Sequence, residues 1–222
     1  EKDINVEQIV TQVKLEVYEG MPTKEISKAL VMTVRSMIEQ DPAYSYIASR
    51  MILAQINEDL LGDKLDYSRI DEQYKETFLN GIRKGIEAGI LDERMSGFDM
   101  TRLSSALVRS RDELFMYLGS QTLYERYLVR DVDGSGKIFD NIQGFWMRIA
   151  MGSALLEKKN KDEYAIQFYE IMSKLLYTPS TPTLFHAGTV KPQLSSCYLN
   201  TVTDSLDNIF KTYSDNAQLS KW

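Results

Sequence analysis

Apolar residues recur at the three- and four-residue spacing of an amphipathic helix along most of the first 176 residues. Residues 1–62 are predicted to contain three helices. The second follows the break at residues 20–22 and has Thr23 as its cap. The third opens at Asp41-Pro42, where Asp is the N-cap and Pro takes the first helical position.

The same spacing predicts a mainly helical region over residues 63–176, with helices at 67–91, 100–120, 141–158 and 162–176. Glycines within the first of these helices predict close packing, at Gly81, Gly85 and Gly89. Residues 124–129 and 137–139 are predicted strands of a small hairpin, with a turn at 132–136. This acidic turn is not a calcium loop, because Ile142 stands where an EF-hand needs glutamate.

The pattern changes in the last region, residues 177–222. Residues 193–199 are predicted to form a buried strand. Asp204 and Ser205 predict the capped start of a further helix, which still shows apolar spacing at Leu219. A strand that leads directly into a helix suggests that a different architecture begins here.

Composition limits the classes of ligand and of site that this chain can have. The net charge is −6, and no basic cluster is present, so electrostatic binding of nucleic acid is not expected. Single nucleotides remain compatible, because helix N-termini can hold phosphates without formal charge. No long apolar run or signal-peptide pattern occurs, so we expect a cytoplasmic protein that does not enter a membrane. With one cysteine and one histidine, an internal disulfide is impossible and a zinc site is not expected.

Three short segments near the end of the chain combine groups that suit a nucleotide. Thr181 lies in a Thr-Pro-Thr turn, Ser196 precedes Cys197 on the predicted strand, and Asp204 opens the next helix. A helix N-terminus suits a phosphate, and a carboxylate suits ribose hydroxyls. On spacing alone, a lone cysteine on a buried strand is more often a small apolar residue than a catalytic one.

The sequences of these segments resemble the opening of the catalytic barrel of ribonucleotide reductase large subunits. They read Ser-Thr-Pro-Thr-Leu-Phe-His-Ala-Gly-Thr at 180–189, Gln-Leu-Ser-Ser-Cys-Tyr-Leu at 193–199 and Asp-Ser-Leu-Asp-Asn-Ile-Phe at 204–210. Residues 125–128 and 139–152 resemble the all-helical domain that precedes this barrel in class I enzymes. The resemblance implies a mainly α N-terminal region followed by the opening strand and helix of a ten-stranded α/β barrel.

The same resemblance implies roles for individual residues. Cys197 matches the first cysteine of the redox pair that reduces the ribose, and Thr181 and Ser196 match residues that hold the nucleoside diphosphate substrate. The positions that match the deoxynucleotide effector site are Asp204, Ser205 and Leu206. The implied reaction replaces the ribose 2′-hydroxyl by hydrogen through a thiyl-radical mechanism.

The resemblance also implies partners. The thiyl cysteine and the second redox cysteine are absent from this sequence, whose single cysteine is Cys197. We therefore expect a complementary C-terminal segment, without which the chain is inactive. The family further implies a homodimer of catalytic subunits, a metal-containing small subunit that supplies the radical, and a thioredoxin- or glutaredoxin-type reductant. No cofactor is expected in this chain itself.

Residues 18–23 and 44–50 resemble the helical part of an ATP-cone, the activity-control domain of this family. Thr23 would match a nucleotide-contacting threonine. However, the family's basic β-hairpin is not seen ahead of these helices, and Glu58 stands where a basic residue is expected. We expect a degenerate cone, with a purely structural helical bundle as the alternative. For the whole chain, the competing hypothesis is a non-catalytic nucleotide-binding or assembly module.

Overall fold

A computed structural model describes residues 4–131 and 134–221, and its architecture is helical. The α-helices are α1 (Val6–Glu16), α2 (Thr23–Ser36), α3 (Ala43–Leu61), α4 (Ile70–Glu87), α5 (Met100–Ser105), α6 (Tyr117–Thr122), α7 (Ile142–Ala154), α8 (Lys161–Ser173), α9 (Thr181–His186) and α10 (Leu206–Lys221). Short 3-10 helices are η1 (Gly62–Lys64), η2 (Tyr67–Arg69), η3 (Glu93–Gly97) and η4 (Arg109–Leu114), whereas η5 (Leu123–Tyr127) is a π-helix. None of the described helices is long and apolar enough to cross a membrane.

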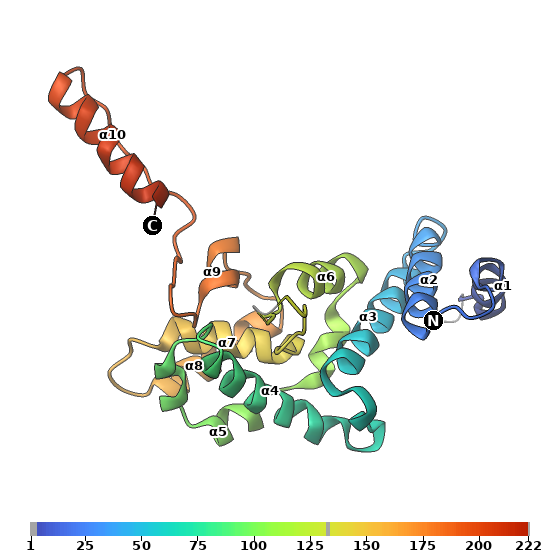
Figure 1. Cartoon of the computed structure of the whole chain (residues 1–222). Helices are drawn as coiled ribbons and strands as arrows, with labels where there is room; N and C mark the ends of the chain where they lie inside the picture. The colour runs from blue at the N-terminus through green and yellow to red at the C-terminus, as the bar shows by residue number, and fades with distance from the viewer. Residues whose placement is uncertain (1–3, 132–133, 222) are drawn as a thin grey trace.

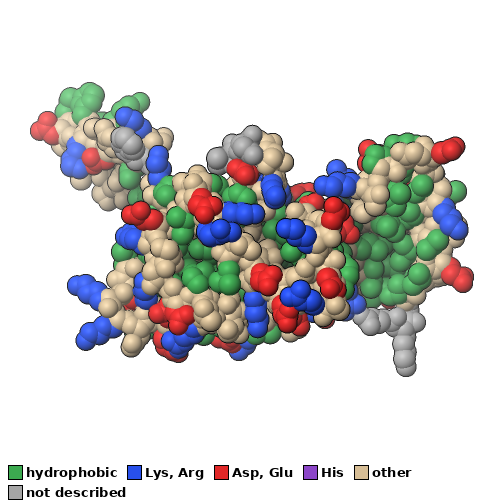
Figure 2. All heavy atoms as spheres, turned by 60° about the horizontal axis from the view of Figure 1, so that its bottom comes forward, with side chains coloured by type: hydrophobic (Ala, Val, Ile, Leu, Met, Phe, Trp, Pro, Cys, Tyr) green, Lys and Arg blue, Asp and Glu red, His purple; other side chains and the backbone are tan. Residues whose placement is uncertain are grey.

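The elements are arranged along one long axis (Figure 1). Helices α1 and α2 form one end, α4 to α9 form the body, and α3 runs between the two. Helix α10 projects from the body at the opposite end (Figure 1). Charged side chains of both signs are scattered over the body, while apolar side chains gather at the α1–α3 end (Figure 2).

The three predicted N-terminal helices are confirmed, with a one-residue difference at the starts of α2 and α3. Thr23 is the first residue of α2 and not its cap, because Pro22 occupies the cap position and no side chain caps this end. At α3, Pro42 takes the cap position in place of the predicted Asp41, whose carboxylate accepts a hydrogen bond from the Ala43 N–H at 2.7 Å. Gly62 ends α3 with φ of 53°, a left-handed value that glycine tolerates best.

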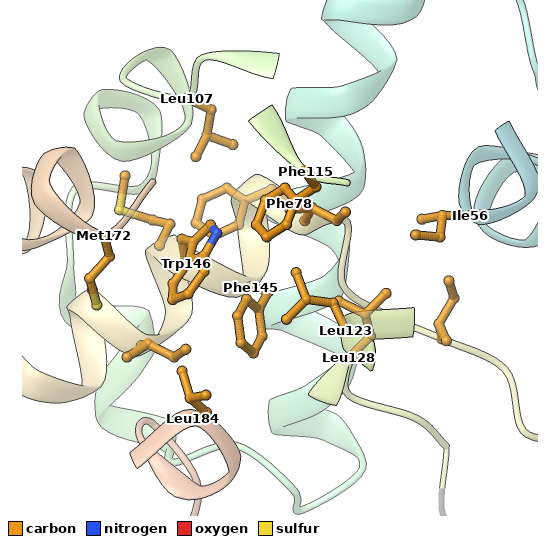
Figure 3. Close-up of a cluster of buried hydrophobic side chains, with 14 of the residues drawn as sticks. Ile56, Phe78, Leu107, Phe115, Leu123, Leu128, Phe145, Trp146, Met172 and Leu184 are labelled. Atoms are coloured by element: carbon orange, nitrogen blue, oxygen red, sulfur yellow. The ribbon is translucent and has the colours of Figure 1, made fainter. Parts of the chain in front are cut away.

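Helix α7 is the centre of the core. Most of its residues are apolar and 11 of the 13 are buried, as expected of a helix that other elements surround. Phe145 and Trp146 lie at its middle and pack edge to face, with ring centroids 4.9 Å apart. Side chains from other helices surround them, including Phe78 of α4, Met172 of α8 and Leu184 of α9 (Figure 3). One continuous cluster of buried apolar residues extends from α1 to α9.

Glycines allow close approaches between helices and loops of this body. A Cβ atom on Gly81 would lie 2.4 Å from the Phe139 carbonyl oxygen, and one on Gly85 would lie 2.6 Å from Leu91 Cδ1. Close packing is therefore confirmed at these two positions. Gly89 differs, because nothing lies within 4 Å of its Cβ position and its φ of 68° serves the turn after α4.

The hairpin prediction is partly wrong. Residues 124–129 do not form a strand, since the π-helix η5 covers residues 123–127. Their aromatic side chains favour strands on average, but contacts to other helices override that preference here. The returning chain forms one antiparallel bridge between Arg130 and Ile138, next to a 2.8 Å hydrogen bond from Asp131 N–H to Lys137 carbonyl oxygen. Residues 132 and 133 of the predicted turn lie outside the described residues.

Two further predictions need correction. Residues 100–120 form two short helices around η4 instead of one long helix. Residues 193–199 are exposed and form no strand in the described chain, so the predicted buried strand is wrong for this structure. A strand needs a neighbour for its backbone hydrogen bonds, and within residues 4–131 and 134–221 none lies beside this segment. The helix predicted after Asp204 is confirmed as α10.

Candidate functional site

The buried side chain of Arg148 anchors the segment that carries the Thr-Pro-Thr turn. Arg148 lies on α7 with a fully buried side chain, and its Nε donates to Asp140 Oδ2 at 3.1 Å. Its Nη1 donates to the Ala187 carbonyl at 2.8 Å, and its Nη2 donates to the Leu184 carbonyl at 3.4 Å. The last carbonyls of a helix lack partners within that helix. The guanidinium group therefore fixes the C-terminal end of α9 to the core.

The chain after α9 is held from two further sides. A Cβ atom on Gly152 of α7 would lie 2.2 Å from the Gly188 nitrogen, so the two backbones are in direct contact. On the other side, Asp92 N–H donates to the Gly188 carbonyl at 3.0 Å, next to the antiparallel bridge between Leu91 and Thr189. Residues 187–189 are thus clamped between α7 and the loop after α4.

Thr181 opens α9 on the exposed side of this anchored segment. Its Oγ1 lies 3.2 Å from the hydroxyl oxygen of Tyr127, which comes from η5. The Tyr127 ring packs against Phe185 at 4.5 Å between centroids. Both contacts involve residues far apart in sequence, so the position of Thr181 depends on the folded helical body.

Helix α9 also holds the beginning of the segment 193–199. Thr183 Oγ1 donates to the Leu194 carbonyl at 3.1 Å. The His186 Nδ1 atom lies 3.1 Å from the Gln193 carbonyl oxygen, so this nitrogen is the protonated one. The histidine acts here as a packing and turn residue.

Ser196 and Cys197 lie three and four residues after Gln193, and both are exposed. Cys197 is a free thiol, and neither side chain makes a hydrogen bond to any other residue in the described part of the chain. Thr181 and this pair are thus joined through α9 and Leu194, and in the described part of the chain no hydrogen bond links the Thr181 hydroxyl to the thiol. The sulfur is open to a molecule arriving from solvent.

The predicted effector residues lie at the start of α10. The Ser205 hydroxyl accepts a hydrogen bond from Asn208 N–H at 3.2 Å, which confirms the predicted cap. Asp204 is exposed, and 73% of Leu206 is exposed. Thr23 lies on α2 at the opposite end of the molecule, so the structure does not bring it near these residues (Figure 1).

A pocket of about 700 Å³ lies between α2, α3, η5 and the hairpin. Its charged lining residues are Lys24, Lys28, Asp59, Glu125, Arg130 and Lys137. Four positive and two negative groups leave a net positive lining in a chain of net charge −6. Among the described residues, none from 177 onwards lines this pocket, so it is separate from the Thr181 and Cys197 segment.

Sequence reasoning missed a buried polar network next to α7. Asp112 Oδ2 accepts from the Tyr74 hydroxyl at 2.7 Å, and Asp112 Oδ1 accepts from Gln143 Nε2 at 2.7 Å. The Tyr169 hydroxyl donates to Gln143 Oε1 at 2.7 Å. Burial raises the pKa of Asp112 to about 7. The signal that could have revealed the network is Gln143, a polar residue inside a mostly apolar helix.

Comparisons with known proteins agree with this architecture. Residues 113–192 match the family model described as the ribonucleotide reductase all-alpha domain. The chain is 40% identical over 94% of its length to the ribonucleoside-diphosphate reductase subunit alpha of Chlamydia pneumoniae, covering 20% of that protein. It is 34% identical over 99% of its length to the subunit alpha of Helicobacter pylori (strain 26695), covering 26% of it. The large subunit of Arabidopsis thaliana is 30% identical over 92% of this chain, which covers 24% of that subunit.

The chain thus spans about a fifth to a quarter of the length of these curated relatives. The family-model match covers the helices of the body from η4 to α9, including α7 and its anchoring arginine. The similarity to the relatives extends over nearly the whole chain. Residues 113–192 therefore match a ribonucleotide reductase all-alpha domain, and nearly the whole chain is similar to the N-terminal part of ribonucleoside-diphosphate reductase large subunits.

Proposed function

We propose that this chain is the N-terminal segment of the catalytic subunit of a class I ribonucleoside-diphosphate reductase. The observation that carries this proposal is the 40% identity over 94% of the chain to a protein named ribonucleoside-diphosphate reductase subunit alpha. The geometry is consistent with it, because the helical body anchors α9 and leaves Thr181 and Cys197 exposed to a ligand. The chain would contribute to the reduction of ribonucleotides to deoxyribonucleotides.

In this proposal, Thr181 and Ser196 hold the nucleoside diphosphate. Phosphate oxygens accept hydrogen bonds, and each of these side chains has one hydroxyl proton to donate. Ser196 has no partner among the described residues, and Thr181 is exposed beside its contact to Tyr127. Both groups are therefore available to an incoming phosphate.

Cys197 would be the first thiol of the redox pair. Reduction of one substrate removes the ribose 2′-hydroxyl as water and converts two thiols into one disulfide, which balances two electrons and two protons. Because Cys197 is the only cysteine in this sequence, the second thiol must come from outside residues 1–222. An external dithiol of the thioredoxin or glutaredoxin type would then restore both thiols by disulfide exchange.

Asp204, Ser205 and Leu206 would bind a deoxynucleotide effector at the start of α10. The first N–H groups and the dipole of a 16-residue helix favour an anionic ligand. The Asp204 carboxylate suits the hydroxyl of a deoxyribose. The family places such a site near the interface of two catalytic subunits, and the exposed apolar residues of α10 suit a homodimer.

The remaining parts of the enzyme would complete the fold and the chemistry. Residues 193–199 would become the opening strand of the α/β barrel when further strands pair with their exposed backbone. We propose three regions, with ATP-cone-like helices at 1–62, the helical domain at 63–176 and the barrel opening at 177–222. A metal-containing small subunit would generate the radical, and the assembled enzyme would work in the cytoplasm.

A complementation assay tests this function. The chain is combined with a polypeptide that carries the rest of the barrel, the small subunit and a dithiol reductant, and conversion of CDP to dCDP is measured. We expect activity only in the complete mixture. Replacement of Thr181 by Val should raise KM for CDP by about tenfold, because one hydrogen bond to a charged group is lost. A complete mixture of folded partners that forms no dCDP would contradict the proposal.

The second candidate function is nucleotide binding without catalysis, favoured by the basic pocket beside α2. Thr23 precedes two of its lining residues, Lys24 and Lys28. Titration with ATP distinguishes this candidate. Binding that is lost on replacement of Lys28 and Lys137 by Ala, in a protein without reductase activity, would support a regulatory module.

A further inference from the structure

One hydrogen bond joins the helical body to the proposed substrate residue. The hydroxyl oxygens of Tyr127 and Thr181 lie 3.2 Å apart across 54 residues of sequence. The Tyr127 ring is fixed by aromatic neighbours, with centroids 4.5 Å from Phe185 and 6.3 Å from Phe145. The ring that carries this hydroxyl thus packs against two aromatic side chains.

The chemistry of a phosphate determines which way this bond must run. Phosphate oxygens at neutral pH accept hydrogen bonds, so Thr181 has to donate its single hydroxyl proton to the ligand. The proton between Thr181 and Tyr127 must then come from the tyrosine. The resulting chain runs from the Tyr127 hydroxyl to Thr181 Oγ1 and from Thr181 to the phosphate. Each bond in such a chain polarises and strengthens the next.

We infer that Tyr127 is a positioning residue for the nucleoside diphosphate, acting through the hydroxyl of Thr181. This inference rests on the proposed function and names a residue of the helical domain as part of substrate recognition. Tyr127 orients the threonine so that its proton points to the diphosphate. Without the tyrosine hydroxyl, Thr181 can turn toward solvent, and the bound ligand loses a preorganised donor.

The π-helix explains why a tyrosine can reach this place and supplies a control. In η5 the Leu128 N–H bonds to the Leu123 carbonyl at 3.1 Å, five residues back. This wide turn changes the direction of neighbouring side chains compared with an α-helix. Tyr124 extends to α3, where its hydroxyl donates to Asp59 at 2.6 Å, while Tyr127 extends to α9. Tyr124→Phe thus removes an equivalent hydroxyl from the same element, away from the substrate residue.

The test compares Tyr127→Phe with Tyr124→Phe in the assembled reductase, with CDP as the substrate. Phenylalanine keeps the aromatic packing and removes only the hydroxyl. We expect Tyr127→Phe to raise KM for CDP about fivefold, equivalent to about 1 kcal/mol, with kcat within about twofold. Tyr124→Phe should leave KM unchanged. A second variant, Phe185→Leu, keeps the Tyr127 hydroxyl but removes the aromatic ring that packs against Tyr127. It should raise KM by a smaller factor than Tyr127→Phe does.

A double-mutant cycle separates this inference from the proposed function. In a Thr181→Val background, which has no hydroxyl to orient, Tyr127→Phe should have no further effect on KM. If Thr181→Val raises KM but Tyr127→Phe does not, the inference is wrong and the substrate role of Thr181 stands. Equal factors for Tyr127→Phe in both backgrounds would also overturn it, since they indicate a general structural effect. If Thr181→Val itself has no effect, the substrate role and the inference both fail.

Discussion

Helices α7 and α10 show how differently two regions of this chain use apolar residues. Eleven of the 13 residues of α7 are buried, whereas Thr212 is the only buried residue in the described part of α10. Helix α10 nevertheless carries large apolar side chains, and 67% of Phe210 and 78% of Tyr213 are exposed. The stability of the chain therefore lies in the body around α7. The proposed chemistry lies on the exposed segment that this body anchors.

The largest loss of stability is expected when Arg148, the buried arginine of α7, is replaced. Arg148→Met leaves Asp140 buried without its partner and frees the carbonyls at the end of α9. Breaking one side of a buried ion pair costs about 3–5 kcal/mol. Urea denaturation should show a loss of this size in the free energy of unfolding. The control is Arg102→Met, which breaks the exposed pair with Glu163 and should cost less than about 1 kcal/mol.

A smaller loss is expected where α7 touches the turn after α9. Gly152→Ala places a Cβ atom against the backbone of Gly188, which cannot move without disturbing the clamped residues. Overpacking of this kind costs about 1–3 kcal/mol. Thermal unfolding should show the loss, and amide exchange should locate it at residues 187–190. Unchanged exchange in this segment would show that it is not clamped by α7.

The pH dependence of stability should come from the same buried region. The pKa of Asp112 is raised by burial from 3.8 to about 7 in the folded chain. A raised folded pKa means that the folded state binds the proton more tightly than the unfolded state. The contribution of Asp112 to the free energy of unfolding is fully present below pH 3.8 and is lost as pH rises through about 7. The free energy of unfolding should therefore fall over this range, by on the order of a few kcal/mol.

Asp112→Asn tests the origin of this slope. The amide cannot titrate, so the fall in stability between pH 4 and pH 7 should become shallower than in the parent chain. Denaturation at several pH values measures it. An unchanged slope would assign the effect to other groups.

The smallest effect is expected at the end of α8. Leu175 has a φ of 58°, a left-handed conformation that is unfavourable for a residue with a Cβ atom. Leu175→Gly should stabilise the chain by at most about 1 kcal/mol, because glycine adopts this conformation freely. Thermal unfolding would show a slightly higher midpoint. A lower midpoint would mean that the half-exposed leucine side chain contributes more by packing than its backbone strain costs.

Sequence patterns predicted the buried body around α7 better than the exposed segment that follows α9. Helices α4, α7 and α8 follow from the apolar pattern, and the cap at Ser205 follows from residue type. The π-helix at 123–127 could not be predicted, because Tyr124 and Tyr127 are directed by distant partners in α3 and α9. The anchoring role of Arg148 was equally hidden, since nothing in the local sequence shows that its guanidinium group meets carbonyls 36 and 39 residues later.

The candidate site was predicted from motif resemblance more than from physical pattern. Thr181, Ser196 and Cys197 have no local feature that distinguishes them from ordinary turn residues. The expected burial of residues 193–199 is the clearest failure. An alternating or apolar run indicates a strand that could be buried, but burial depends on neighbouring strands that lie elsewhere. The exposed Cys197 is thus a position whose surroundings the sequence of this chain does not determine.

The most direct measurement concerns the thiol of Cys197. Cys197→Ser is assayed in the assembled enzyme under multiple-turnover conditions with a dithiol reductant, next to the exposed neighbour variant Ser195→Ala. We expect Cys197→Ser to form no dCDP beyond background while CDP affinity stays within about twofold, and Ser195→Ala to remain active. Sustained dCDP formation by Cys197→Ser would show that this sulfur does not carry electrons to the substrate.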